Sequence, residues 1–119
     1  MMYLMVFLGG GLGSLCRFGM SRWLLTQSSS FPWATFAANI LASSILALIV
    51  YYLPEKYSFG SFKFFLIVGF CGGFSTFSTF SLEIFQMMKS GAISMAILYA
   101  LSSIGMTLLL FYLIDQKTA

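Results

Sequence analysis

The chain has 119 residues, of which 60% are hydrophobic and only 8% are charged, with a net charge of +3. A soluble domain carries roughly 25% charged residues, so this composition predicts an integral membrane protein of one small domain. The few basic residues are spread thinly, which excludes a nucleic-acid-binding patch. The absence of histidine and the scarcity of acids argue against an enzyme built on a nucleophile and a base.

The first apolar segment, residues 2–25, contains closely spaced glycines and a deep arginine. Gly9 and Gly13 form a GxxxG pair, which predicts close packing against a neighbouring helix. Arg17 lies about four residues past the segment midpoint, or roughly 6 Å along a helix. A cation at that depth is a functional-site hypothesis. We therefore expect a structural or electrostatic role for Arg17 near an ion path; the alternative is snorkelling to the interface, which suits Arg22 better.

The second segment, residues 32–53, begins at Pro32, which suits the first turn of a helix. Thr35, Asn39 and Ser43 recur every four residues and therefore share one helical face. The amide of Asn39 offers two hydrogen-bond donors. Two roles are open for it: a hydrogen bond between helices, or a place on the lining of a pore.

The third segment, residues 62–88, contains the stretch GFCGGFSTFSTFSLE at positions 69–83. Gly72 and Gly73 weaken a helix because glycine loses more backbone entropy on ordering than other residues do. The segment midpoint falls at about residue 75, so the weak point lies near the membrane centre. Non-helical backbone survives at that depth only where protein buries it or where it lines a polar cavity. The pattern predicts a third helix that is broken at the midplane.

Aromatic and acidic residues follow this predicted break. Phe77 and Phe80 are three residues apart, so their rings are neighbours on one helical face. An aromatic stripe is typical of packing or lipid contact, but here it is interleaved with hydroxyl groups on a helix that is already interrupted. Glu83 is closer to the interface, where it has an electrostatic or structural role or simply reaches water.

The fourth segment, residues 92–114, carries a second polar track on a single helical face. Its members are Tyr99, Ser103 and Thr107. Together with Asn39 and Thr79, they offer a series of neutral hydrogen-bond donors.

Four spans place both termini on one side of the membrane. That side carries Lys56, Lys63 and Lys117, whereas the other carries Arg22 and Lys89, with Arg17 deeper in the span. So small a bias in positive charge predicts insertion in both orientations. Two oppositely inserted copies could then pair as an antiparallel two-fold dimer.

The run GFCGGFSTFSTFSLE closely resembles the signature GxxGGxTTFSTF of the fluoride channel family known as Fluc or CrcB. The stretch GGGLGSLCRF around Arg17 and the segment from Pro32 to Asn39 resemble two further marks of that family. The resemblance implies passive fluoride efflux across the plasma membrane of a bacterium, which lowers fluoride toxicity in the cytoplasm. It also implies a dual-topology homodimer with two pores and a central structural Na⁺.

The same resemblance implies roles for individual residues. Backbone carbonyls of Gly72 and Ser75 would hold the Na⁺, and the residues matching the family's pore are Asn39, Phe77, Phe80 and Tyr99. The chain departs from the family pattern at three positions. Ser75 stands where threonine is usual, and Ala34 and Ala42 replace glycines often found near the asparagine, which bears on the packing of the second helix.

Other functions are compatible with four short spans. A proton-coupled exporter of the small multidrug resistance type is also four-span and dual-topology, but it uses a glutamate in the first helix, and the first segment here has no acid. A structural or assembly protein without transport activity is a further alternative. Within the channel family, a heterodimer with a diverged second copy remains open beside the homodimer.

Overall fold

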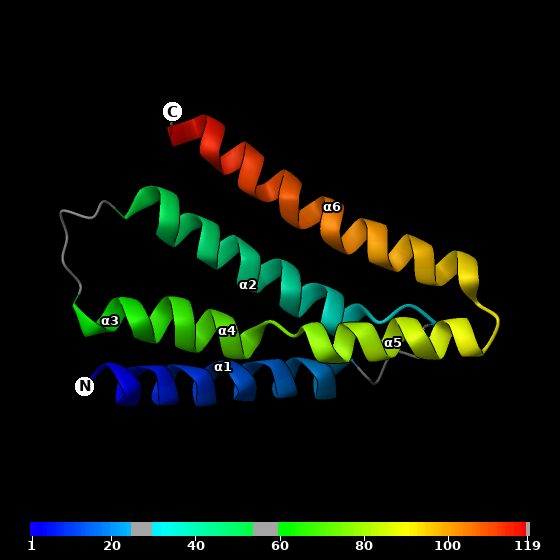
Figure 1. The fold of residues 1–119 in the computed structure, drawn as a ribbon, viewed down its shortest axis with the longest axis horizontal. Coiled ribbons are helices and arrows are strands. Elements are labelled where there is room, and N and C mark those ends of the chain that lie inside the picture. The colour runs from blue at the N-terminus through cyan, green and yellow to red at the C-terminus, as the bar shows by residue number, and fades with distance from the viewer. Residues whose placement is uncertain (25–29, 54–59, 119) are drawn as a thin grey trace.

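The structure, a computed structural model, describes residues 1–24, 30–53 and 60–118. All regular elements in these ranges are helical: α1 (Met2–Leu24), α2 (Trp33–Tyr52), α3 (Ser61–Phe64), the π-helical segment η1 (Phe65–Cys71), α4 (Gly72–Phe74), α5 (Phe77–Lys89) and α6 (Ile93–Thr118). Four helices, with α3 to α5 counted as one, are long and apolar enough to cross a membrane. Figure 1 shows that successive spans alternate in direction, so both termini lie at the same end. The predicted all-α fold with four spans is confirmed.

The spans begin and end close to where the sequence places them. The third runs from Ser61 to Lys89 against the expected 62–88, and the first two also agree closely. The last helix continues beyond its expected end at Ile114 to Thr118, because polar residues can extend a helix into water after the apolar stretch has ended. Lys56 and much of the two loops that follow the first and second spans fall outside the described residues.

The third span is interrupted in its middle, as predicted. Ser75 and Thr76 are extended, with φ −78° and ψ 157° for Ser75 and φ −151° and ψ 120° for Thr76. The segment before the break is wound as a π-helix from Phe65 to Cys71. α5 starts anew at Phe77, with Thr76 as its N-cap.

α1 lies along the first half of the third span, from α3 to α4 (Figure 1). Glycines on both sides bring the two backbones together. A Cβ on Gly9 would collide with the Phe65 carbonyl oxygen, and one on Gly13 would collide with that of Phe70. On the other side, a Cβ on Gly73 would collide with the Gly10 carbonyl oxygen. The Gly9–Gly13 pair therefore packs closely against a neighbouring helix, as expected.

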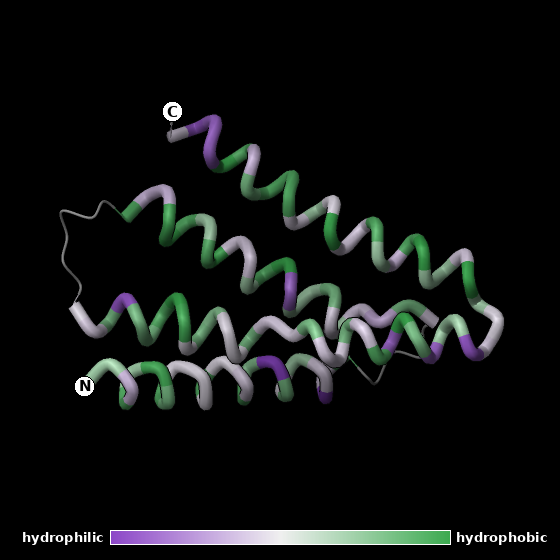
Figure 2. Tube along the Cα trace, in the orientation of Figure 1, coloured by the Kyte–Doolittle hydropathy of each residue, from purple (hydrophilic) through white to green (hydrophobic). Residues whose placement is uncertain are grey.

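α2 lies on the other side of the third span, and α6 packs on α2 and α5. Ala38, Ala42 and Phe74 form the buried core between α2 and the break, with Met20 and Phe70 packed against it. Hydrophobic residues also run along the outside of every span in Figure 2. An outer surface of this kind is suited to lipid, because it cannot be solvated by water.

We expect Gly13→Ala to lower the free energy of unfolding by about 1–3 kcal/mol, because the added methyl group would force α1 away from η1. Gly11→Ala is the matched control, since a Cβ at Gly11 meets nothing within 4 Å among the described residues. Thermal unfolding of the purified chain in detergent measures both. Equal stability of the two variants would contradict the close packing of α1 on the third span.

Candidate functional site

The side chain of Asn39 holds the break from the α2 side. The Thr76 backbone N–H donates to Asn39 Oδ1 at 2.7 Å, and Asn39 Nδ2 donates to the Thr76 carbonyl at 3.2 Å. A single amide side chain thus satisfies both backbone polar groups of one extended residue. Thr76 Oγ1 in turn accepts from the Thr79 backbone N–H at 3.2 Å, which caps α5. Only one of the two N–H donors of Asn39 is used in this way.

Arg17 reaches the break from the opposite side. Its Nε donates to the Gly73 carbonyl at 3.2 Å. In an unbroken helix this carbonyl would accept from the Phe77 backbone N–H, but α4 ends at Phe74. The arginine therefore supplies a donor that the interrupted helix lacks. Within the described part of the chain, Arg17 forms no ion pair, so no carboxylate shares this half-buried position.

The carbonyls at the break are not all engaged by hydrogen bonds. Ser75 N–H and Ser75 Oγ both donate to the Cys71 carbonyl. The side chains of Arg17 and Asn39 donate to the carbonyls of Gly73 and Thr76, respectively. Among residues 1–24, 30–53 and 60–118, no hydrogen bond reaches the carbonyls of Gly72 and Ser75. Both residues line a hollow of about 150 Å³ between α2 and the third span. The family resemblance implies that these two carbonyls hold a cation. No cluster of three acidic, histidine or cysteine side chains that could hold a metal is found in the same ranges.

A larger cavity of about 310 Å³ lies where α2, the break, α5 and α6 meet. Five of the seven residues predicted to contact an ion line it, namely Asn39, Phe77, Phe80, Ser103 and Thr107. Ser43, Ser75 and Thr76 add further polar groups, and no lining residue is charged. The predicted Thr79 and Tyr99 lie outside the lining. The cavity is thus an uncharged, mostly apolar site that carries several hydroxyl and amide groups beside two aromatic rings.

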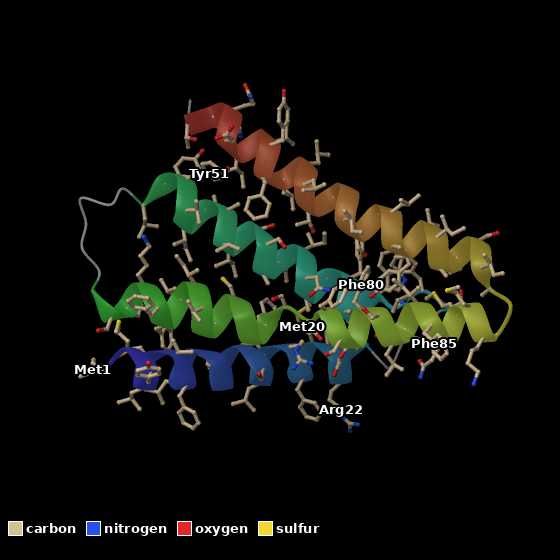
Figure 3. The ribbon with its side chains drawn as sticks, viewed as in Figure 1. Met1, Met20, Arg22, Tyr51, Phe80 and Phe85 are labelled. Carbon is tan, nitrogen blue, oxygen red and sulfur yellow. The ribbon has the colours of Figure 1, made fainter. Side chains whose placement is uncertain are left out.

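The two phenylalanines occupy very different environments. Their ring centroids are 6.2 Å apart with the planes inclined at 41°. Phe80 is 9% exposed, and its ring meets that of Tyr99 in an edge-to-face contact at 5.0 Å. Figure 3 shows Phe80 on the side of α5 that faces α2 and α6, whereas Phe85 is on the outer side. Phe77, by contrast, is 80% exposed, so one wall of the cavity is open on the single chain.

Ser103 has an unusual hydroxyl group. The residue is 7% exposed, lines the large cavity, and its Oγ has no hydrogen-bond partner among the described residues. A buried hydroxyl without a partner is costly. Thr107, one turn further along α6, donates its own hydroxyl to the Ser103 carbonyl at 2.8 Å. Ser103 is therefore the donor on this track that is available to a ligand.

Glu83 ties three helices together beside the cavity. Thr35 Oγ1 of α2 donates to its Oε1 at 2.7 Å, and the hydroxyl of Tyr99 on α6 donates to its Oε2 at 2.7 Å. Tyr99 is fully buried, and Thr35 nearly so. The hydroxyl of Tyr99, a residue predicted to contact an ion, is engaged with Glu83. The sequence analysis missed Thr35 as part of this group; its position one turn before Asn39 on the same face was the available signal.

Comparison with known proteins extends this picture. Residues 4–114 match the model of a family described as CrcB-like protein, camphor resistance. A protein of Thermus thermophilus is 40% identical over 112 residues, which cover 93% of this chain and 88% of that protein. Proteins of Leptospira interrogans and Phocaeicola vulgatus are 43% identical over 91 residues and 36% identical over 107 residues. These matches cover 74% and 89% of this chain, and 71% and 88% of the two relatives. All three relatives bear the name fluoride-specific ion channel FluC.

Replacing Tyr99 with phenylalanine removes a donor to the Glu83 carboxyl. We expect the free energy of unfolding to fall by about 1–3 kcal/mol, because a partly buried carboxylate oxygen loses its partner. Tyr112→Phe on the same helix is the control, since Tyr112 is 60% exposed. Urea or thermal unfolding in detergent would compare the two, and equal losses would show that the Tyr99–Glu83 hydrogen bond does not stabilise the fold.

Proposed function

This chain belongs to the CrcB-like family, and we propose that it is a fluoride channel that lets the ion leave the cytoplasm passively and so lowers its toxicity. The relatives that bear the name of such a channel come from bacteria, so the plasma membrane of a bacterium is the proposed location. One observation carries the proposal beyond the family name. Ser103, whose buried hydroxyl has no hydrogen-bond partner among the described residues, lines an uncharged cavity in the middle of a membrane-spanning fold.

The cavity has the chemistry that a small, strongly hydrated anion requires. Fluoride must exchange its water for other donors before it can enter the membrane. Ser103 Oγ and the second N–H of Asn39 are both available for this purpose. The Thr107 hydroxyl could donate to the ion only after its hydrogen bond to the Ser103 carbonyl is broken. Because no lining group is charged, an ion that binds here can also leave, as conduction requires.

The phenylalanines contribute through their ring edges. The edge of an aromatic ring carries the positive end of its quadrupole. Phe80 is held in place by its contact with Tyr99, and Phe77 lies at the open wall of the same cavity. We infer that both rings turn edges toward the passing ion, and that Thr79 and Tyr99 lie next to the path rather than on it.

A second copy of the chain completes the pore. The open wall of the cavity is formed by Phe77, Ile104 and Leu108, all of which are exposed on the single chain. The basic residues of the sequence are nearly balanced, with Lys56, Lys63 and Lys117 following from the topology on the side of the termini, Arg22 and Lys89 on the other, and Arg17 deeper in the span. This balance supports an antiparallel homodimer with two pores, whereas a heterodimer with a diverged copy would need a second gene.

The backbone carbonyl oxygens at the break are suitable ligands for a structural Na⁺ between the two copies. In the described part of the chain no hydrogen bond reaches the carbonyls of Gly72 and Ser75, both residues line one small hollow, and hard oxygen ligands suit such a cation. Two carbonyls from each of two copies would give four ligands. The bound ion would supply positive charge that links the two breaks across the dimer axis.

The proton-coupled exporter is the rival function. It requires a carboxylate that exchanges protons with the membrane interior, and α1 contains none. Glu83 is the only acid of the third span, and hydroxyl groups engage both of its oxygens. A group held in this way supports a structural role better than a carrier role.

Fluoride efflux from liposomes that contain only this purified chain tests the function directly. We expect rapid efflux without a pH gradient, and a fall of about tenfold or more in Phe80→Ile, equivalent to about 1.4 kcal/mol or more. Phe85→Ile, on the outer side of the same helix, should retain the flux. Strict dependence on a proton gradient would instead support the exporter, and no flux from the purified chain would refute a channel made of this chain alone.

Ser103→Ala separates conduction from stability. The substitution removes an unsatisfied buried hydroxyl, so unfolding should become no easier, while the fluoride flux should fall because a donor to the ion is lost. Ser102→Ala is the control, since its hydroxyl donates to the Tyr99 carbonyl within α6. A fall in flux that only follows a fall in stability would contradict a direct role for Ser103.

A further inference from the structure

Arg17 is the polar residue near the break that the ion cavity does not explain. It does not line the cavity, and it approaches the break from α1, whereas Asn39 approaches from α2. Its contact lies where α1 and the third span approach closely, because Gly73 packs directly on Gly10. The arginine is therefore positioned to act on the backbone of the break rather than on a passing ion.

The hydrogen bond uses only one part of the guanidinium group. Nε donates to the Gly73 carbonyl, and no hydrogen bond of the remaining N–H groups is found among residues 1–24, 30–53 and 60–118. A positive charge at this depth is costly. It would also lie close to carbonyls that are proposed to bind a cation. The geometry therefore favours the donor over the charge as the useful feature of this side chain.

We propose that Arg17 is a positioning residue for the break, and that it acts through hydrogen-bond donation from Nε to the Gly73 carbonyl rather than through its charge. The peptide group of Gly73 lies between the two carbonyls expected to bind Na⁺, those of Gly72 and Ser75. Fixing the Gly73 carbonyl limits the directions in which these neighbouring carbonyls point. The link to Na⁺ rests on the proposed function, whereas the hydrogen bond to the break does not.

Three substitutions at this position separate the donor from the charge. Arg17→Gln places its Nε2 the same number of bonds from Cα as the arginine Nε, so it keeps the donor and loses the charge. Arg17→Lys keeps the charge but places a methylene group at that position. Arg17→Met has neither feature. The three side chains are similarly long, so packing changes little among them.

The experiment measures two quantities for the purified chain in detergent. The first is the melting temperature without Na⁺, and the second is the NaCl concentration that gives half of the Na⁺-dependent rise in melting temperature, with N-methyl-D-glucamine chloride holding the ionic strength constant. We expect this NaCl concentration for Arg17→Gln to lie within about twofold of that for the unsubstituted chain. Arg17→Lys and Arg17→Met should require about tenfold more Na⁺, as loss of one hydrogen bond predicts.

Two controls separate this role from general stability. Arg22→Met and Arg22→Gln alter an exposed arginine of the same helix and should change neither quantity. Tyr99→Phe should lower the melting temperature through the lost hydrogen bond to Glu83, away from α1, without changing the Na⁺ requirement.

The outcomes are distinct. Arg17→Lys matching the unsubstituted chain while Arg17→Gln matches Arg17→Met would overturn the proposal in favour of a role for charge. Equal behaviour of all three variants would also overturn it. If the unsubstituted chain shows no response to Na⁺, the proposed central cation fails instead, and the order of melting temperatures without Na⁺, with glutamine above lysine and methionine, still decides the role of Arg17.

Discussion

The structure depends on satisfying the backbone of a helix that is broken in mid-membrane. Water is absent there, so each freed N–H and C=O group needs a partner inside the protein. Asn39 takes both polar groups of Thr76, and Arg17 takes the carbonyl of Gly73. Partners from α1 and α2 thus hold the break from two sides. No hydrogen bond reaches the carbonyls of Gly72 and Ser75 within the described ranges, and both residues line one hollow, where we propose a cation.

Close helix packing makes this arrangement possible. α1 and the first half of the third span approach each other at glycines, among them Gly9, Gly13 and Gly73. An arginine side chain can reach a backbone carbonyl of the next helix only if the two helices lie this close. In the described ranges α1 does not contact α5. The second half of the span packs instead on α2 and α6. The two halves of the third span therefore pack mainly on different helices, and the break lies between the two halves.

The neutral cavity lies on the side of the break where α5 packs on α2 and α6. Glu83 joins α2, α5 and α6 through Thr35 and Tyr99, and Tyr99 supports the ring of Phe80 at the cavity wall. The Glu83 carboxylate thus helps to hold the walls of the cavity, and Glu83 is not among the residues that line it. That separation is important for an anion pathway, because a charged wall would either repel the ion or trap it.

The sequence by itself determined the features that depend on local pattern. Apolar runs set the four spans, paired glycines and hydroxyls placed the break near residue 75, and four-residue spacing put Asn39, Ser103 and Thr107 on inward faces. Only the tertiary structure decided which polar groups meet. The Thr35–Glu83, Asn39–Thr76 and Arg17–Gly73 pairs are 48, 37 and 56 residues apart in the chain. Such pairs depend on the rotation and depth of one helix against another, which periodicity within a single helix does not contain. For the same reason Tyr99 shares the spacing of Ser103 and Thr107 and yet lies outside the cavity lining.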